Sequence, residues 1–386
     1  MSARVGIDVR ALCEEGPEGE DGLYALRMLR ALLEEEHSYR LVLLGYGRYE
    51  DCLPQDLWGV LEWRRVARPF PGTAALMPLQ QQVLAFTVRE AGLDLFHAMS
   101  RDASPFIELP SLVTVRRFLP PAFRPPARGP REPFMRLSLR AAARRADRVV
   151  VPSGHLAREL REAWGLGEGR TVVVPEGVGE EFRPPADREK KRLSLVPLGI
   201  DRPYFLYVGD GGPASNLRVL LLALRRAVLR EGKDLQAVLA LQGAAPRKDI
   251  LHDVIISTGL EKRVVVLPSC PRSLLPTLYG GALALACLDL HGGSHLPVLE
   301  AMACGTPVLA ARASSLPESV GNAALLVDPA DAGAVAGRMG ELARRLELRR
   351  ELSERGRKHA AGLGWRAVAR RLLETYGEIL DERGRR

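Results

Sequence analysis

The stretch 282–311, ALALACLDLHGGSHLPVLEAMACGTPVLAA, most constrains the fold of this chain. Residues 282–288 are a short apolar run, as expected for a buried strand of a parallel sheet. A polar loop with two glycines follows at 291–295, and a helix is expected over 296–304. A second apolar strand is expected at 308–311. The pattern predicts a strand–loop–helix–strand unit of a parallel α/β sheet.

The junction between this loop and the helix is the first candidate site. Free N–H groups at a helix start, together with the helix dipole, can hold a diphosphate without a basic side chain. With Pro297 opening the helix, Glu300 lies within about its first turn. A carboxylate there can accept hydrogen bonds from ribose hydroxyls. The alternative is that Glu300 only favours the helix start electrostatically, and spacing alone favours that alternative.

The remainder of the chain alternates strands and helices in two halves. Strands are expected in the first half at 4–9, 39–45, 93–97, 112–115, 148–152 and 171–174. In the second half they are expected at 205–208, 235–241, 264–267, 282–288, 308–311 and 324–327. Helices are expected at 22–33, 217–230, 332–355 and 365–383. Strands separated by helices predict doubly wound, Rossmann-like α/β sheets.

The length of 386 residues favours two domains, since one ordinary core rarely grows so large. Residues 186–203 are rich in proline and charge and are the expected linker. The amino-terminal domain is then 1–185 and the carboxyl-terminal domain 204–364. Residues 365–386 form a final helix.

The segment LPVLEAMACGTPVLA, followed by SSLPESVGNAALLVDPAD, resembles the donor-site segment of the family-4, or group 1, glycosyltransferases. The likeness extends over most of the chain, with lower quality toward the front. It implies a GT-B fold, in which two Rossmann-like domains face each other across a cleft and the last helix crosses back to the first domain. It also implies sugar transfer from a nucleotide-diphosphate sugar with retention, and no metal or other cofactor is expected.

The resemblance assigns roles to named residues of this chain. Glu300 is expected to bind the nucleotide ribose, as the matching glutamate does in the family. The loop before the helix is expected to face the diphosphate and sugar through Gly293, Ser294, His295 and Leu296. Gly209 and Asn216 are expected to frame the opposite rim of the donor site, and the acceptor would enter from the first domain.

The sequence departs from the family pattern on the donor side. The family has a glutamate eight residues before the one matching Glu300, where this chain has Gly292. The family also places an arginine and a lysine after the first strand of this domain, to grip the diphosphate. Asp210 and Ser215 stand there instead, although Asn216 matches. An aspartate facing a diphosphate would repel it by roughly a kcal/mol or more, depending on screening.

Two further departures lie in the first half. The family often follows the 112–115 strand with His-Asp beside the reacting sugar, and this chain has Arg116-Arg117. Where the family has a glycine-rich loop, this chain carries Glu18, Glu20 and Asp21. We therefore consider Arg116 a candidate catalytic cation that would act from the opposite domain. The alternative is that both arginines form a solvated pair.

Charge and composition suggest partners only weakly. The formal net charge is +8, and arginines alternate with apolar residues through 116–148. That segment suits anionic lipid headgroups or an acidic acceptor, while the alternative is an ordinary helix with a solvated face. No nucleic-acid partner is expected, because aromatic residues make up only 5% and no binding motif is present.

The cysteines and histidines predict no metal centre. Cys13, Cys52, Cys270, Cys287 and Cys304 show no CxxC spacing, so reduced thiols without a disulfide framework are expected. His291 and His295 are four residues apart, but they flank a loop and lack a nearby third ligand.

The sequence thus predicts a glycosyltransferase that acts on a glycan or lipid-linked acceptor in cell-envelope or polysaccharide biosynthesis. A cytoplasmic location is expected, and the segment 116–148 leaves open whether the protein also contacts the inner face of the membrane. The competing hypothesis is a catalytically degenerate paralogue that binds a nucleotide, a glycan or a partner transferase. The substitutions at Gly292, Asp210 and Ser215 favour the paralogue, while Glu300 and the intact helix junction favour the enzyme.

Overall fold

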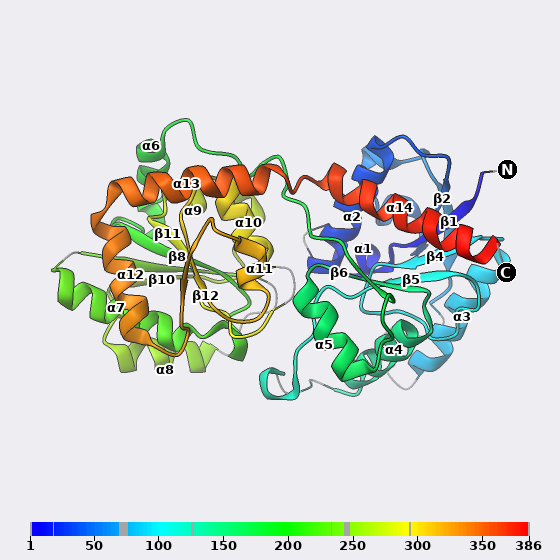
Figure 1. The fold of residues 1–386 in the computed structure, drawn as a ribbon, viewed down its shortest axis with the longest axis horizontal. Coiled ribbons are helices and arrows are strands. Elements are labelled where there is room, and N and C mark those ends of the chain that lie inside the picture. Colours follow the sequence, from blue (N-terminus) through cyan, green and yellow to red (C-terminus); the bar gives the residue numbers. More distant parts are fainter. Residues whose placement is uncertain are drawn as a thin grey trace. The chain divides into compact units, whose positions relative to one another are not determined.

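The computed structural model describes residues 2–17, 19–68, 76–124, 127, 129–232, 234–242, 248–292 and 295–384. The chain folds into two compact units (Figure 1). Unit 1 comprises Met1–Phe118, Pro126–Pro175 and Trp365–Arg386, and unit 2 comprises Leu119–Pro125 and Glu176–Gly364. Each unit is a parallel sheet with helices, which confirms the predicted pair of doubly wound α/β units. That the two face each other across a cleft stays a prediction.

Unit 1 contains a seven-stranded parallel sheet in the order β3-β2-β1-β4-β5-β6-β7. The strands are β1 (Arg4–Asp8), β2 (Arg40–Tyr46), β3 (Glu62–Val66), β4 (Leu95–Ala98), β5 (Ser111–Thr114), β6 (Arg148–Val151) and β7 (Thr171–Val173). The described α-helices are α1 (Arg10–Glu15), α2 (Glu20–Glu34), α3 (Met77–Glu90), α4 (Arg131–Arg145), α5 (Gly154–Trp164) and α14 (Trp365–Gly384). The strand order reverses between β1 and β4, so a ligand crevice is expected at their carboxyl ends.

The last helix, α14, belongs to the core of unit 1. In Figure 1 this red helix lies against the blue α2, with which it is in contact. Leu372 and Tyr376 are fully buried and pack in one cluster with Val5 and Ile7 of β1. The Tyr376 hydroxyl lies 2.8 Å from Nδ1 of His97 on β4, which joins this helix to the sheet. An apolar stripe on α14 therefore explains why this distant segment folds with the first unit.

One prediction for the cysteines is wrong. Cys13 on α1 and Cys52 form a disulfide, with their Cα atoms 4.5 Å apart, so not all five cysteines are reduced thiols. The sequence does not reveal this pairing because the two residues are 39 positions apart and come together only when α1 packs beside β2. Cys270, Cys287 and Cys304 of unit 2 are free and buried.

Unit 2 contains a six-stranded parallel sheet in the order β10-β9-β8-β11-β12-β13. The strands are β8 (Tyr204–Gly209), β9 (Gln236–Leu241), β10 (Val264–Leu267), β11 (Ala284–Cys287), β12 (Val308–Ala311) and β13 (Leu325–Val327). The described α-helices are α6 (Arg188–Leu193), α7 (Leu217–Glu231), α8 (Lys248–Thr258), α9 (Leu275–Gly281), α10 (Leu296–Ala303), α11 (Leu316–Val320), α12 (Ala332–Arg344) and α13 (Leu346–Ala361). Here the order reverses between β8 and β11.

The structure departs from the expected linker. It draws the boundary between the units at Glu176 rather than after residue 185, because Phe182 packs against Tyr279 in the core of unit 2. The stretch 186–203 also carries the helix α6, which contacts α9, and the fully buried Leu195. Among the described helices, none is long and apolar enough to cross a membrane.

Candidate functional site

The loops that follow β8 and β11 meet at the reversal point of the sheet in unit 2. The amide of Leu290 donates a hydrogen bond of 2.8 Å to the carbonyl of Ala214, which joins the two loops. His295 then adopts a left-handed conformation with φ of 47°, and α10 begins at Leu296. The strand and the helix expected from the sequence are thereby confirmed. In open parallel sheets this position is where ligands bind.

The first turn of α10 offers an anion fewer donors than the sequence suggested. Pro297 has no N–H group, and the amide of Val298 donates to the carbonyl of His295 at 2.9 Å. The amide of Leu296 and the helix dipole are what this turn can present to a diphosphate. Gly293 and Ser294, which were expected to face the diphosphate, lie outside the described residues.

Glu300 is fully buried within unit 2, with an exposed fraction of 0%. One carboxylate oxygen pairs with Nη2 of Arg272, and the other accepts a hydrogen bond of 3.1 Å from the Tyr279 hydroxyl. Burial raises the pKa of Tyr279 well above its usual value, and the Glu300 carboxylate raises it further. Burial lowers the pKa of Arg272, but the charge and the hydrogen bond of Glu300, together with the charges of Tyr279 and Glu181, outweigh it, so this pKa is raised. Both oxygens of Glu300 are thus engaged inside the protein.

Arg272 is held in place from the other side by an aromatic ring. Its guanidinium carbon lies 5.6 Å from the centre of the Phe182 ring, which packs edge-on against Tyr279 with centroids 5.9 Å apart. The Arg272 side chain is 19% exposed, so it covers Glu300 as the outermost member of the cluster. Sequence reasoning missed Arg272 and Tyr279. They precede β11 in the segment PRSLLPTLY, which carries no motif of its own.

The loop after β8 is closed by its own polar groups. One Asp210 oxygen accepts hydrogen bonds from the Gly212 amide at 2.9 Å and from the Ser215 hydroxyl at 3.2 Å. The hydroxyl of the buried Tyr207 donates to Ser215 Oγ at 2.7 Å and accepts from the Gly211 amide at 3.2 Å. Asp210 therefore shapes the turn that follows Gly209, the last residue of β8.

Asn216 occupies the end of this turn. It is in the left-handed region with φ of 53°, and its side-chain amide donates to the Pro329 carbonyl at 2.8 Å. The structure thus places Gly209 and Asn216 at the carboxyl edge beside β11. The side-chain amide of Asn216 is, however, hydrogen-bonded to the protein's own backbone. Their role in donor binding stays a prediction.

The His295 ring lies so close to Gly292 that it leaves no room for a side chain there. A Cβ atom added at Gly292 would lie 2.6 Å from Cε1 of His295, closer than a side chain is found in practice. The hydroxyl of Ser314 bonds both the amide and the carbonyl of Gly292, at 3.2 and 3.1 Å. A glutamate at this position, as in the family pattern, would therefore require the His295 ring to move.

One cluster in unit 2 has the composition of a metal site. Cys287, Asp289 and His295 each bring one ligand atom to within 4.8 Å of the others. Burial raises the pKa of Cys287 well above its usual value, and the charge of Asp289 raises it further, which favours the neutral thiol. The expectation of metal-independent chemistry stays a prediction.

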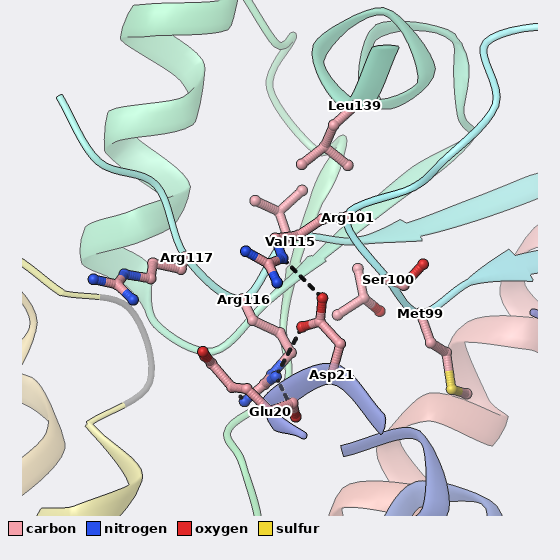
Figure 2. A pocket seen from close by; sticks show the side chains of 10 residues that line it. Glu20, Asp21, Met99, Ser100, Arg101, Val115, Arg116, Arg117 and Leu139 are labelled. Atoms are coloured by element: carbon pink, nitrogen blue, oxygen red, sulfur yellow. Dashed lines mark hydrogen bonds and ion pairs between the residues drawn. The ribbon is translucent and has the colours of Figure 1, made fainter. Parts of the chain in front are cut away.

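The carboxyl edge of the sheet in unit 1 carries a small cavity of about 20 Å³ (Figure 2). Asp21 lies between two guanidinium groups, with Arg101 Nε at 2.9 Å and Arg116 Nη1 at 3.1 Å from its two oxygens. Arg116, the catalytic candidate from the sequence, is buried and also lies 4.8 Å from the centre of the Tyr24 ring. The alternative of a solvated Arg116-Arg117 pair is therefore wrong for Arg116, while Arg117 is exposed. Glu18 lies outside the described residues.

A buried ion-pair network lies beside this cavity and was also missed from the sequence. Arg10 is 1% exposed and binds both oxygens of Asp8, at 2.9 and 2.8 Å. It reaches Asp102 Oδ2 at 3.1 Å and the Tyr46 hydroxyl at 3.1 Å. Because the strands β1, β2 and β4 lie side by side, their carboxyl ends bring these distant residues together. No local motif in the sequence marks such a set.

Two family models match the chain. Residues 194–359 match "Glycosyl transferases group 1", and residues 22–182 match "Glycosyltransferase Family 4". Together they cover most of both units. The chain belongs to the group 1 glycosyltransferases.

Part of the chain is similar in sequence to curated proteins of known name. It is 32% identical over 243 residues to a D-inositol 3-phosphate glycosyltransferase of Nocardia farcinica, covering 61% of this chain and 54% of that protein. It is 26% identical over 248 residues to the O-antigen chain mannosyltransferase B of Escherichia coli, covering 63% of this chain and 64% of that protein. The chain spans just over half the length of the inositol-phosphate relatives that it matches.

Solved structures share the whole fold. A sucrose-phosphate synthase from Thermosynechococcus elongatus has a TM-score of 0.75 at 18% identity, over 98% of this chain and 100% of that one. HepE from Anabaena, solved in complex with UDP and glucose, has a TM-score of 0.73 at 18% identity, over 97% and 100%. These likenesses show the GT-B fold and, at such low identity, no more than the fold.

Proposed function

We propose that this protein transfers a sugar from a nucleotide-diphosphate sugar to an acceptor hydroxyl, with retention of configuration and without a metal ion. Its family supports this, as do the names of its relatives, which are glycosyltransferases. The structural neighbour HepE was solved with UDP and with UDP-glucose, which supports a nucleotide-sugar donor for this chain.

The observation that carries the proposal is the reversal point of the sheet in unit 2. There the loops after β8 and β11 are joined through Leu290 and Ala214, directly before the start of α10. The diphosphate would bind the Leu296 amide at the positive end of the α10 dipole, where developing negative charge on the leaving group is stabilised. The Leu296 amide and the helix dipole would favour departure of the nucleoside diphosphate.

Glu300 would hold the nucleotide ribose in this proposal. Its carboxylate is engaged by Arg272 and Tyr279, so a ribose hydroxyl has to replace the Arg272 contact or share an oxygen with it. Arg272 is the partner with solvent access, and its displacement would place a guanidinium next to the bound diphosphate. Donor binding would thus supply a cation that the Asp210 loop lacks.

The acceptor would bind at unit 1. The relatives named above act on D-inositol 3-phosphate and on an O-antigen chain, so we propose a polyol, glycan or lipid-linked glycan as the acceptor. The expected setting is cell-envelope or polysaccharide biosynthesis. Within the arginine-rich segment 116–148, the exposed Arg140, Arg144 and Arg145 of α4 would lie near anionic headgroups.

A second candidate function is a non-catalytic paralogue that binds a nucleotide or glycan, or regulates a partner transferase. The closed network around Asp210 favours it, because this network puts negative charge where the family pattern has cations. A transfer assay separates the two functions, since only the enzyme releases a nucleoside diphosphate in the presence of acceptor.

Thermal unfolding with a panel of nucleotide-diphosphate sugars tests the donor site. A ligand at 100 times its dissociation constant should stabilise the protein by about 2.7 kcal/mol. All 4 tryptophans, Trp58, Trp63, Trp164 and Trp365, lie in unit 1, so unfolding of unit 2 should be followed by far-UV circular dichroism or hydrogen exchange.

Glu300→Gln should remove most of this donor-induced stabilisation. The matched control is Glu231→Gln. Glu231 is the last residue of α7, the helix that starts at the proposed site, so it lies at the far end from the donor. Like Glu300, its side chain is buried, at 6% exposed, and pairs with an arginine, Arg344. An equal donor shift in Glu300→Gln and in the wild type would place the nucleotide elsewhere.

A further inference from the structure

The cavity in unit 1 lies where two neighbouring strands end. Met99, Ser100 and Arg101 follow β4, and Val115, Arg116 and Arg117 follow β5. Glu20 and Asp21, in the first turn of α2, close it from the other side. Carboxyl ends of parallel strands beside a reversal of strand order are the usual place for a ligand, and this cavity is next to the reversal between β1 and β4.

The charges around the cavity have the geometry of an anion site that is already filled by a side chain. Each Asp21 oxygen faces a different arginine, Arg101 at 2.9 Å and Arg116 at 3.1 Å (Figure 2). Guanidinium groups from two sides are the arrangement that proteins use for phosphate oxygens as well as for carboxylates. Asp21 therefore occupies the position that a ligand phosphoryl group would take.

The two arginines are held very differently. The Arg116 side chain is 8% exposed, donates to the Glu20 carbonyl at 2.9 Å and packs on the Tyr24 ring. The Arg101 side chain is 63% exposed and reaches Asp21 and Glu15 from the solvent side. One cation is thus fixed in the wall, and the other can follow an incoming anion. Arg117 also lines the cavity but points away from Asp21 in Figure 2.

The size of the cavity decides how a ligand could enter. About 20 Å³ accommodates roughly one water molecule and no phosphate group. Asp21 sits in the first turn of α2 next to Glu20, whose side chain is 56% exposed. A rotation of the Asp21 side chain toward solvent would vacate the space between the guanidinium groups. The Glu20 carboxylate, 3.7 Å from Arg116, and the Glu15 carboxylate, 3.3 Å from Arg101, would remain as further partners of the two arginines.

We propose that this cavity binds the phosphate group of a phosphorylated polyol acceptor, and that Asp21 is a placeholder which that phosphate displaces. The inference rests on the proposed function, since it names the acceptor class for the transferase. Arg116 then binds acceptor rather than the donor diphosphate. Asp21 keeps the two arginines paired in the absence of acceptor and disfavours anions that cannot compete with it.

Substitutions on the two sides of the ion pair should have opposite effects on ligand binding. The probe is an inositol monophosphate, titrated calorimetrically into the full chain, with inositol and inorganic phosphate as comparisons. Arg101→Gln should weaken binding of the phosphorylated probe about tenfold, because one charge-assisted pair is lost. Asp21→Asn should strengthen it about tenfold, because the competing carboxylate is gone. Inositol should bind weakly and equally to all variants.

Arg30→Gln is the matched control, since Arg30 forms an exposed ion pair with Asp56 elsewhere in unit 1. It should leave the affinity unchanged. Arg101 is chosen over the buried Arg116 so that the variant folds, which tryptophan fluorescence of unit 1 verifies. If Asp21→Asn weakens binding as Arg101→Gln does, Asp21 is only a scaffold and the proposal fails. Absence of binding to the wild type and to Asp21→Asn would equally overturn it.

Nucleoside diphosphate titrations distinguish the acceptor from the donor as the source of the phosphate. Arg101→Gln should leave the affinity for a nucleoside diphosphate within about twofold of the wild type. An equal loss for both ligands would assign the cavity to the donor and contradict the acceptor proposal. If a nucleotide-sugar stabilises the protein and inositol phosphate does not bind, this inference alone is wrong. If inositol phosphate binds and no nucleotide-sugar stabilises the protein, the transferase proposal is wrong and the anion site remains supported.

Discussion

Near the carboxyl edge of each sheet lies a buried carboxylate that is paired with arginine, Glu300 in unit 2 and Asp21 in unit 1. The two sites differ in the number of charged groups around that carboxylate. In unit 2, Glu300 has one cation, Arg272, and a neutral hydroxyl from Tyr279. In unit 1, Asp21 has two cations, Arg101 and Arg116, and each binds its own oxygen. The two arginines of unit 1 also face a second carboxylate each, Glu15 at 3.3 Å from Arg101 and Glu20 at 3.7 Å from Arg116. In the two proposals above, the same edge of the same type of sheet binds a ribose in unit 2 and a phosphate in unit 1.

The disulfide is the largest expected difference between the units. It closes a loop of 39 residues in unit 1, and α1, which carries Cys13, also carries Glu15, whose carboxylate contacts Arg101 and the Asp21 amide. Cys13→Ser combined with Cys52→Ser should lower the free energy of unfolding of unit 1 by about 4 kcal/mol in the loop-entropy account. Denaturant unfolding followed by tryptophan fluorescence measures it.

Reductant provides the control for that prediction. The described cysteines of unit 2 are free, so hydrogen exchange in its strands should not respond to reduction of the wild type. If unit 1 unfolds at the same denaturant concentration with and without the disulfide, the disulfide does not stabilise unit 1 and the prediction is wrong.

Glu300→Ala should have the next largest effect, at about 3 kcal/mol. It leaves the Arg272 guanidinium and the Tyr279 hydroxyl without their shared acceptor in a buried site, and loss of one member of such a pair is costly. The measurement is denaturant unfolding of unit 2 by hydrogen exchange. Tyr279→Phe removes only the hydroxyl and should cost about 1 kcal/mol. A Glu300→Ala variant as stable as the wild type would show that the pair is open to solvent.

The contrast also explains what the sequence could predict. In unit 2 the candidate site lies in one continuous segment, so β11, α10 and β12 were predicted within a few residues. Glu300 was named as a candidate from that segment, and its role stays a prediction. The six strands of that unit have short apolar runs, and all were expected from the sequence. Arg272 was missed because it reaches Glu300 only through the packing of α9 on α10.

Unit 1 was harder because its site is assembled from separate segments. Asp21, Arg101 and Arg116 come from three segments whose proximity depends on strand order. The strand β3 was not predicted, since EWRRV is polar and half-exposed at the sheet edge. The single helix expected at 332–355 is broken at Arg345 into α12 and α13, because α12 packs on α7 and α13 on α10. No glycine or proline marks that break.

His97 gives unit 1 a pH dependence of intermediate size. It is fully buried between Tyr376 and Thr114, which lines the cavity, and burial lowers its pKa from 6.5 to about 3. The unfolded chain therefore binds a proton more readily between these values, so stability is complete above about pH 6.5 and is lost as pH falls. Lowering pH from 7 to 5 should remove about 2 kcal/mol through this residue.

The check is the difference between the wild type and His97→Gln in tryptophan-detected unfolding at the two pH values. Gln keeps two polar atoms near Tyr376 and Thr114 but does not titrate, so its stability should depend less on pH. Parallel pH profiles would show that His97 is protonated in the folded protein.

Arg101→Gln should have the smallest effect on stability, below about 1 kcal/mol, because the Arg101 side chain is 63% exposed and its ion pairs are screened by water and salt. Asp21 keeps its second partner, the buried Arg116, and Glu15, which loses Arg101, keeps the hydrogen bond from the Asp21 amide. The measurement is tryptophan-detected unfolding at low and high salt, with Arg30→Gln as the comparison at another exposed pair. A cost near that of Glu300→Ala would mean that Arg101 is as firmly fixed as Arg272, and the two sheet edges would then be alike. A small cost together with a large loss of anion affinity would instead show that Arg101 serves binding more than folding, which is the distinction that the unequal burial of the two arginines leads us to expect.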